Sequence, residues 1–144
     1  MKILFILFTS TILLFAIKLT KSGDYVIDDT HKIMWQDSME NVKVRVTHKK
    51  AIEYCDKLSA NGFSDWRLPS KEEYTYIVDK SRIKKEIMID KSFKYVLQDD
   101  YWAADRTWIR NFGRYAYYIF IKSGSIYYQN RTYEKFVRCV RDMK

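Results

Sequence analysis

The segment Asn61–Glu73, NGFSDWRLPSKEE, constrains the fold of this chain more than any other stretch. Its opening Asn-Gly pair, ending at Gly62, favours a turn with positive φ. Pro69 is the only proline in the sequence and ends the extended run that follows the turn. Ser70 with Glu73 three residues later is typical of a capping box, so a helix is expected to begin just after Ser70. The segment therefore predicts a structured loop that leads into a helix.

The first 22 residues predict export. Residues 3–17 are an unbroken apolar or hydroxylic run, which suits a signal peptide and falls short of the roughly 20 residues that span a bilayer comfortably. Two alternatives stay open: residues 1–22 are a signal peptide removed before Gly23, or they are retained as an N-terminal anchor. In both cases residues 23–144 form a single extracytoplasmic domain, which is periplasmic, secreted or held at the inner membrane by residues 3–17.

The charge of the chain is moderately basic. The whole sequence has 26 Lys and Arg against 18 Asp and Glu, and residues 1–22 hold three of the lysines and no acid. Residues 23–144 therefore carry 23 − 18 = +5. This charge fits either a lysine-rich soluble surface or an attraction to polyanions such as sulfated glycans. Nucleic acid is not expected as a partner of an exported protein without a dense basic run.

The two cysteines, Cys55 and Cys139, lie far apart in the sequence. In an oxidising compartment an even pair indicates one disulfide bond, and the alternative is two buried free thiols. Neither of the two histidines, His31 and His48, lies at metal-ligand spacing to a cysteine, so no metal site is expected.

The order of the predicted elements indicates an α+β fold, with two helices followed by an antiparallel strand-rich half. The first helix covers residues 48–59, with Cys55 on its apolar stripe, and the second runs from Ser70 to about residue 79. Ser123-Gly124 is the clearest hairpin turn. The expected strands cover residues 25–27, 32–36, 101–104, 108–112, 115–121, 125–128 and 136–140, with a weak one at 92–97. A bridge between the two cysteines would join the first helix to the last strand.

Taken together, these features resemble the domain at the C-terminus of Legionella collagen-like adhesins, over about residues 24–142. The residues that carry the resemblance are Asp28, Met34-Trp35, Ala51, Tyr54-Cys55, Leu58, Gly62-Phe63, Asp65-Trp66-Arg67-Leu68-Pro69-Ser70, Glu73, Tyr101-Trp102-Ala103-Ala104 and Val137-Arg138-Cys139-Val140-Arg141.

The resemblance implies a C-type lectin-like fold, related in outline to formylglycine-generating enzymes, with a disulfide that ties the first helix to the last strand. It also implies binding of sulfated glycosaminoglycans, with which the adhesin relatives are associated. The chain departs from those relatives because it has no collagen-like repeat. It also has Ala103 and Ala104 where the family usually has small hydroxyl residues, so a hydrogen-bonding role there is lost.

No motif in the sequence predicts catalysis, a cofactor or a calcium-dependent lectin site. The chain has no Gly-x-Ser-x-Gly, no His-Glu-x-x-His, no glycine-rich phosphate loop and no Trp-Asn-Asp triplet. Trp35, Trp66 and Trp102 are expected in the core. Arg67 and Arg138 are expected to pair either with carboxylates, Asp65 among them, or with a ligand.

Aromatic and basic residues of the second half are the best candidates for ligand binding, because aromatic faces stack on sugar rings and arginine forks pair with sulfate or carboxylate. Strand alternation places half of these aromatics in the core. The candidate ligand-binding residues are Arg106, Trp108, Arg110, Arg114, Tyr117, Tyr128 and Arg131.

The sequence thus predicts an exported, non-catalytic binding module for an anionic glycan or an extracytoplasmic partner protein. One alternative is a membrane-anchored envelope subunit or scaffold that binds other proteins. A third and more distant hypothesis is an enzyme related to the sulfatase-modifying fold, which would need a reactive cysteine.

Overall fold

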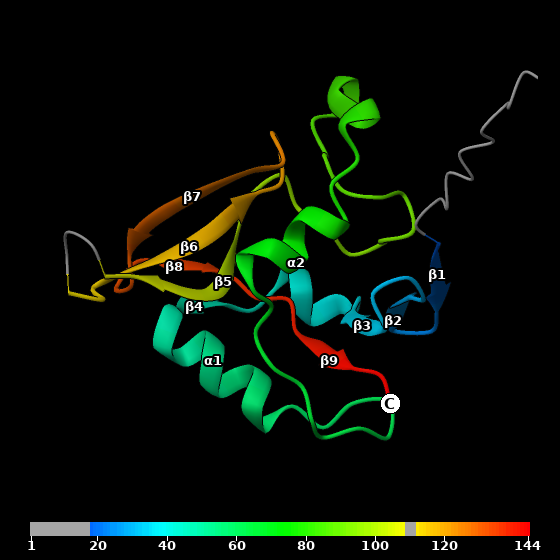
Figure 1. Ribbon diagram of the computed structural model, residues 1–144, viewed down its shortest axis with the longest axis horizontal. Coiled ribbons are helices and arrows are strands. Elements are labelled where there is room, and N and C mark those ends of the chain that lie inside the picture. The colour runs from blue at the N-terminus through cyan, green and yellow to red at the C-terminus, as the bar shows by residue number, and fades with distance from the viewer. Residues whose placement is uncertain (1–17, 109–111) are drawn as a thin grey trace, which may run out of the picture.

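The computed structural model describes residues 18–108 and 112–144, and their strands form two sheets (Figure 1). The smaller sheet has the strand order β1-β2-β3-β9 and consists of Leu19–Ser22 (β1), Tyr25–Asp28 (β2), Ile33–Gln36 (β3) and Val140–Asp142 (β9). The larger sheet has the order β4-β8-β5-β6-β7 and consists of Arg45–Thr47 (β4), Asp100–Thr107 (β5), Tyr115–Phe120 (β6), Ser125–Asn130 (β7) and Glu134–Phe136 (β8). The helical segments are Met39–Val42 (η1, a 3₁₀-helix), His48–Lys57 (α1), Lys71–Tyr76 (α2) and Lys80–Lys85 (η2, also 3₁₀). The α+β class is confirmed, although four strands precede the first α-helix and the sequence predicted only two of them.

The smaller sheet places the C-terminal strand beside the N-terminal hairpin. β3 pairs antiparallel with β2 on one side and with β9 on the other. The turn between β2 and β3 forms because the Asp28 carboxylate accepts hydrogen bonds from the N–H groups of Thr30 and His31, each at 3.0 Å. The two strands predicted for residues 25–36 are therefore confirmed.

The outer strand of this sheet, β1, comes from residues that the sequence assigns to the signal or anchor segment. β1 pairs antiparallel with β2 over all four of its residues. The Lys21 ammonium also donates hydrogen bonds to the Asp37 carboxylate and to the Asp37 carbonyl oxygen. A cut before Gly23 would remove this strand from the sheet, and the cleavage itself stays a prediction. Among the described residues, none of the helices has the length and apolar character needed to cross a membrane.

The predicted disulfide is confirmed and joins α1 to the segment just before β9. Cys55 and Cys139 are bonded, with their Cα atoms 5.6 Å apart, and both are fully buried. The strand expected over residues 136–140 is not continuous. β8 ends at Phe136 in the larger sheet and β9 begins at Val140 in the smaller one. Cys139 therefore lies in the link between the two sheets and not within a strand.

The loop and capping box of the Asn61–Glu73 segment form as predicted. Asn61 and Gly62 both have positive φ. The Ser70 hydroxyl accepts a hydrogen bond from the Glu73 N–H at 3.1 Å, and the Glu73 carboxylate accepts one from the Ser70 N–H at 2.7 Å. α2 begins after this box but ends at Tyr76, earlier than the predicted residue 79.

β5, β6 and β7 form the antiparallel meander that the sequence predicts. The hairpin turn at Ser123-Gly124 is confirmed, since the Gly124 N–H donates to the Phe120 carbonyl at 2.8 Å. One expected strand is wrong, because residues 92–97 form no strand. The strand expected over residues 108–112 lies mostly outside the described residues, and its two described ends, Trp108 and Phe112, are not in a strand. The single Tyr101–Phe136 pair between β5 and β8 is parallel, which the sequence did not predict.

Two groups of buried side chains make up the core. One lies around Trp35, between the smaller sheet, α2 and one face of the larger sheet. The other surrounds the disulfide and contains Trp66 and Trp102, beneath α1. The three tryptophans are 0%, 3% and 0% exposed, which confirms that they belong to the core.

Candidate functional site

Three of the candidate residues, Arg106, Trp108 and Arg131, meet at the free end of the larger sheet and are called here the arginine–tryptophan cluster. Arg106 is near the end of β5, Trp108 follows β5, and Arg131 follows β7. In Figure 1 this end of the sheet extends to the left, away from β1 on the opposite side. A bulge in β5 between Trp102 and Arg106 shifts the register so that Arg106 pairs with Ala116 of β6.

Arg106 is fixed in place by the turn that follows. Its Nε and Nη2 atoms donate hydrogen bonds to the Gly113 carbonyl oxygen at 3.0 and 2.8 Å. Its guanidinium lies over the Trp108 ring at 4.6 Å from the centroid, and Trp108 is 63% exposed. A β-carbon on Gly113 would lie 2.6 Å from Arg106 Nη2 and 2.9 Å from the Trp108 ring. The arrangement therefore needs glycine at this position.

Arg131 is held by a buried histidine. Arg131 Nε donates to His48 Nδ1 at 2.9 Å, while the other ring nitrogen of His48 contacts the Ala103 carbonyl oxygen at 2.8 Å. These contacts require the neutral tautomer with the proton on Nε2. Burial lowers the pKa of His48 to about 4, and the positive charges of Arg131 and Arg106 act in the same direction. His48 is thus an uncharged support for Arg131 at neutral pH.

The two arginines are close enough to repel each other, and no described carboxylate neutralises them. Burial together with the charge of Arg106 lowers the pKa of Arg131. Neither arginine forms a salt bridge with a carboxylate of the described residues. A bound sulfate or carboxylate would relieve this repulsion and could accept charge-assisted hydrogen bonds. The exposed Trp108 ring beside the two charges offers a flat apolar surface for a sugar ring.

Two of the other candidate residues, Tyr117 and Tyr128, lie apart from this cluster. They are a cross-strand pair on the opposite face of β6 and β7, with ring centroids 6.0 Å apart. The Lys71 ammonium of α2 lies 4.0 Å from the centroid of the Tyr117 ring. Arg114 is exposed and contributes its carbonyl oxygen to the Arg131 N–H at 2.9 Å. Arg110 lies outside the described residues.

Sequence reasoning missed the two residues that position the cluster, His48 and Gly113. His48 is the first residue of the helix predicted over residues 48–59, and Gly113 follows the strand expected over residues 108–112. No local pattern could have identified either role, because both depend on contacts between segments that are distant in the sequence.

The arginines of the Trp-Arg-Leu-Pro and C-terminal motifs have carboxylate partners within the fold. Arg67 forms a bidentate pair with Glu73, with both hydrogen bonds at 2.7 Å, and also contacts Asp142 at 2.9 Å. Arg138 pairs with Asp37 at 3.2 Å. Asp65, which was considered as a partner of Arg67 or Arg138, instead pairs with Arg141 at 2.6 Å.

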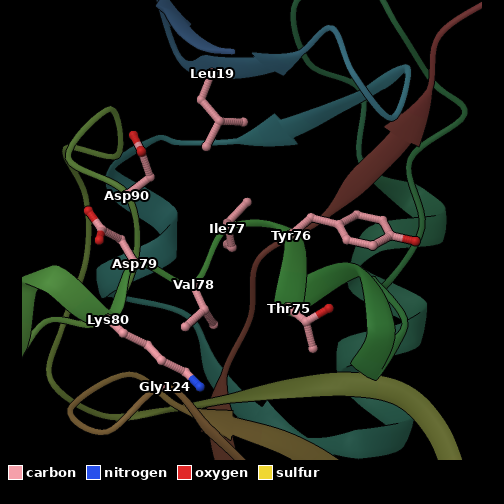
Figure 2. A pocket seen from close by; sticks show the side chains of 9 residues that line it. All are labelled: Leu19, Thr75, Tyr76, Ile77, Val78, Asp79, Lys80, Asp90 and Gly124. Carbon is pink, nitrogen blue, oxygen red and sulfur yellow. The ribbon is translucent and has the colours of Figure 1, made fainter. Parts of the chain in front are cut away.

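A separate groove of about 640 Å³ lies between β1, the end of α2 and the turn after β6. Figure 2 shows Leu19 of β1 facing Ile77 and Val78, with the carboxyl groups of Asp79 and Asp90 to one side. None of the three members of the arginine–tryptophan cluster lines it.

The described residues include no group of three or more His, Cys, Asp and Glu that could hold a metal ion. Both cysteines of the sequence are in the disulfide. The reactive thiol required by the enzyme hypothesis is therefore missing in this oxidised form.

The family model for the Lcl C-terminal domain, the C-terminal domain of the Legionella collagen-like protein, matches residues 24–141. The match covers both sheets apart from β1 and the last residue of β9. Among curated proteins, none matches the chain.

Proposed function

The chain belongs to the Lcl C-terminal domain family, and from this premise we propose that it is an exported, non-catalytic module that binds an anionic glycan. The family comes from adhesin-like proteins and is not a known catalytic family. The disulfide and the family together fit an extracytoplasmic protein. The ligand class is the one that the resemblance implies, and the residues assigned to it are the part that goes beyond the family.

One observation carries the choice of ligand: Arg106 and Arg131 approach each other without a described carboxylate partner, beside an exposed tryptophan ring. Sulfate and uronic acid groups match the planar donor fork of arginine. Trp108 supplies the stacking surface that a sugar ring needs. A neutral glycan would leave the repulsion between the arginines in place, so an anionic one is favoured.

We also propose that the fold is C-type lectin-like. The disulfide from α1 to the residue just before β9 supports this proposal, because the resemblance implies a disulfide between the first helix and the last strand. The pairing of β3 with β9, which places the C-terminal strand beside the N-terminal hairpin, also supports it.

A binding assay with matched arginine variants tests the glycan proposal. A glycan array screened at low and at physiological salt should select sulfated or uronic acid glycans, with weaker binding at the higher salt. Arg106→Ala and Arg131→Ala should each weaken binding by roughly 10- to 100-fold, the value of one charge-assisted hydrogen bond. The control is Arg45→Ala, because Arg45 is an exposed arginine on β4 that stacks on Phe136 instead of Trp108. Binding that does not respond to salt and falls equally in all three variants would contradict the proposal.

A second candidate function, a membrane-anchored envelope subunit, is favoured by β1. Because β1 is integrated in the sheet, the apolar run of residues 3–17 is separated from the domain by Lys18 alone. Mass spectrometry of the native protein distinguishes the two cases. Retention of residues 1–22 with a co-purifying protein and a blank glycan array would favour the subunit.

A further inference from the structure

Residues 80–91 form a basic excursion on the side of the domain away from α1, and neither the family match nor the glycan proposal accounts for it (Figure 1). The segment holds five basic residues against two acidic ones, Glu86 and Asp90. The basic residues are Lys80, Arg82, Lys84, Lys85 and Lys91.

The excursion has a rigid base. The Asp79 N–H donates to the Met88 carbonyl at 2.9 Å, and the Asp90 N–H donates to the Ile77 carbonyl at 2.8 Å. The Met88 N–H donates in turn to the carbonyl of Ile121, just after β6, at 2.8 Å. These bonds close the excursion into a loop with a two-stranded neck, and η2 forms its tip. The tip therefore holds a defined orientation relative to the larger sheet.

The tip presents unpaired lysines around an exposed aliphatic side chain. Lys80, Lys84, Lys85 and Lys91 are exposed and form no salt bridge with a described carboxylate. Ile83, in the middle of η2, is 65% exposed. Exposure of an isoleucine side chain to water is unfavourable. An exposed isoleucine with lysines on either side is typical of surfaces that bind anionic lipids.

The base of the excursion adjoins the point where the N-terminal segment enters the domain. Leu19 lines the groove of Figure 2 together with Lys80 and Asp90. The Ser92 hydroxyl donates to the Leu19 carbonyl at 3.3 Å. The apolar run of residues 3–17 lies immediately before Lys18 and Leu19 in the sequence. The base of the excursion therefore lies beside Leu19, close to the start of the described residues.

We propose that the basic excursion docks on a bilayer containing anionic phospholipids, with the lysines at the phosphate groups and Ile83 at the level of the acyl boundary. Lysine side chains near a negatively charged membrane are attracted over about a Debye length, roughly 8 Å at physiological salt. The occupant is a lipid surface rather than a soluble polyanion because the exposed Ile83, and the apolar residues 3–17 that precede Leu19 in the sequence, have no counterpart in a soluble glycan. Docking in this way leaves the arginine–tryptophan cluster on a distant part of the domain (Figure 1).

A single fluorescent label tests the proposal in the full chain. Both native cysteines are bonded to each other, so Ile83→Cys adds the sole free thiol, which is labelled with an environment-sensitive fluorophore. The labelled protein is reconstituted into vesicles of phosphatidylcholine alone or of phosphatidylcholine mixed with phosphatidylglycerol, an anionic phospholipid. Residues 3–17 are present in the full chain with both kinds of vesicle, so any difference between the vesicles reports on the excursion.

In the anionic vesicles only, we expect the fluorescence emission of the label to shift to shorter wavelength and to be quenched by a quencher attached to lipid. Both effects should be lost at high salt. Each lysine at such a surface is worth about a fivefold change in binding, so the Lys84→Ala/Lys85→Ala variant should lower the ratio of docked to undocked label roughly 30-fold. The control Lys49→Ala/Lys50→Ala removes the same charge from exposed positions on α1 and should leave the ratio unchanged. A control label at the exposed Ser59 should not shift.

Three results would overturn the proposal. The first is an emission from the label at position 83 that stays that of a water-exposed label in anionic vesicles. The second is an emission shift of equal size in neutral vesicles. The third is an emission shift that a soluble sulfated polymer produces with neutral vesicles. The last result would assign the excursion to a soluble polyanion. None of these outcomes depends on Arg106 or Arg131, so the docking proposal and the glycan proposal can fail separately.

Discussion

Replacing Asp37 with Asn is expected to destabilise the protein strongly, because the change breaks a buried ion pair. The Asp37 side chain is fully buried. One carboxylate oxygen accepts hydrogen bonds from Arg138 at 3.2 Å and from the Tyr95 N–H at 2.9 Å. The other accepts from the Lys94 N–H at 2.8 Å and from the Lys21 ammonium. Asparagine has nearly the same volume but turns one of these two acceptors into a donor, which faces groups that also donate.

The magnitude follows from the Arg138 guanidinium. Its side chain is 1% exposed, and its other partners are the carbonyl oxygens of Gln36 and Tyr95 and the rings of Phe93 and Tyr101. Without the carboxylate, a full positive charge stays buried among neutral groups. Removal of one partner from a buried pair costs about 3–5 kcal/mol, so we expect the free energy of unfolding to fall by about 4 kcal/mol.

Urea denaturation at pH 7 with the disulfide intact measures this loss. Tryptophan fluorescence is a suitable signal because Trp35, Trp66 and Trp102 are all buried. The matched control is Asp142→Asn, which removes a 71% exposed carboxylate from Arg67, a partly exposed arginine that keeps Glu73 as a partner, and it should stay close to the unmodified protein. A loss in the Asp37 variant below about 1 kcal/mol, the range of an ordinary surface pair, would refute the reasoning.

The same group gives a pH dependence with a definite sign. Burial alone raises the pKa of the Asp37 carboxyl, but Arg138, Lys21 and two backbone N–H donors outweigh it and hold that pKa below its usual 3.8. A depressed pKa in the folded state means that the stabilisation is present above the unfolded pKa and is lost as the pH falls through the folded value. The difference in unfolding free energy between the unmodified protein and Asp37→Asn should therefore shrink below about pH 4. A difference that grows on acidification would contradict this assignment.

Reduction of the disulfide, or Cys55→Ala with Cys139→Ala, should lower the free energy of unfolding by about 4.5 kcal/mol, because the bond closes a loop with a sequence separation of 84. Denaturation with and without reductant measures this loss, and an unchanged midpoint would count against the bond. Ser70→Ala should cost about 1 kcal/mol by the same assay, through loss of the helix cap, whereas Ser70→Thr should retain most of it. Arg67→Lys should lower the free energy of unfolding by about 1 kcal/mol, because lysine cannot reproduce the bidentate contact with the Glu73 carboxylate. The partial exposure of Arg67 limits this loss, so a loss as large as that of Asp37→Asn would contradict the reasoning.

Features that depend on neighbours in the chain could be predicted from the sequence. The capping box needs only Ser70 and Glu73, and the hairpin at Ser123-Gly124 needs only a turn pair between two strands. The disulfide is longer in range, but an exported chain with two cysteines leaves few other arrangements. The alternation of β6 also follows from its sequence, because successive side chains in a strand must point to opposite faces.

The candidate site was predictable only as a set of residue types. Strand alternation could show that half of the aromatics face inward, but not that Tyr117 and Tyr128 lie on the face opposite Arg106. That separation depends on the strand register, in which Arg106 pairs with Ala116 of β6 and Tyr117 pairs with Tyr128 of β7. The support of Arg131 by His48 joins residues 83 positions apart.

What the sequence by itself determined is the α+β class, the buried tryptophans, the disulfide and the loop that leads into α2, because each follows from local geometry, burial or the pairing of two cysteines. Only the tertiary structure decided which sheet each strand joins and which carboxylate each arginine pairs with. It also decided that Arg106 and Arg131 form no salt bridge with a carboxylate of the described residues. Lys21 and Arg138 share the Asp37 carboxylate although they come from opposite ends of the chain. The physical reason is that charge pairing acts through space, so its partners are fixed only when the two sheets have packed.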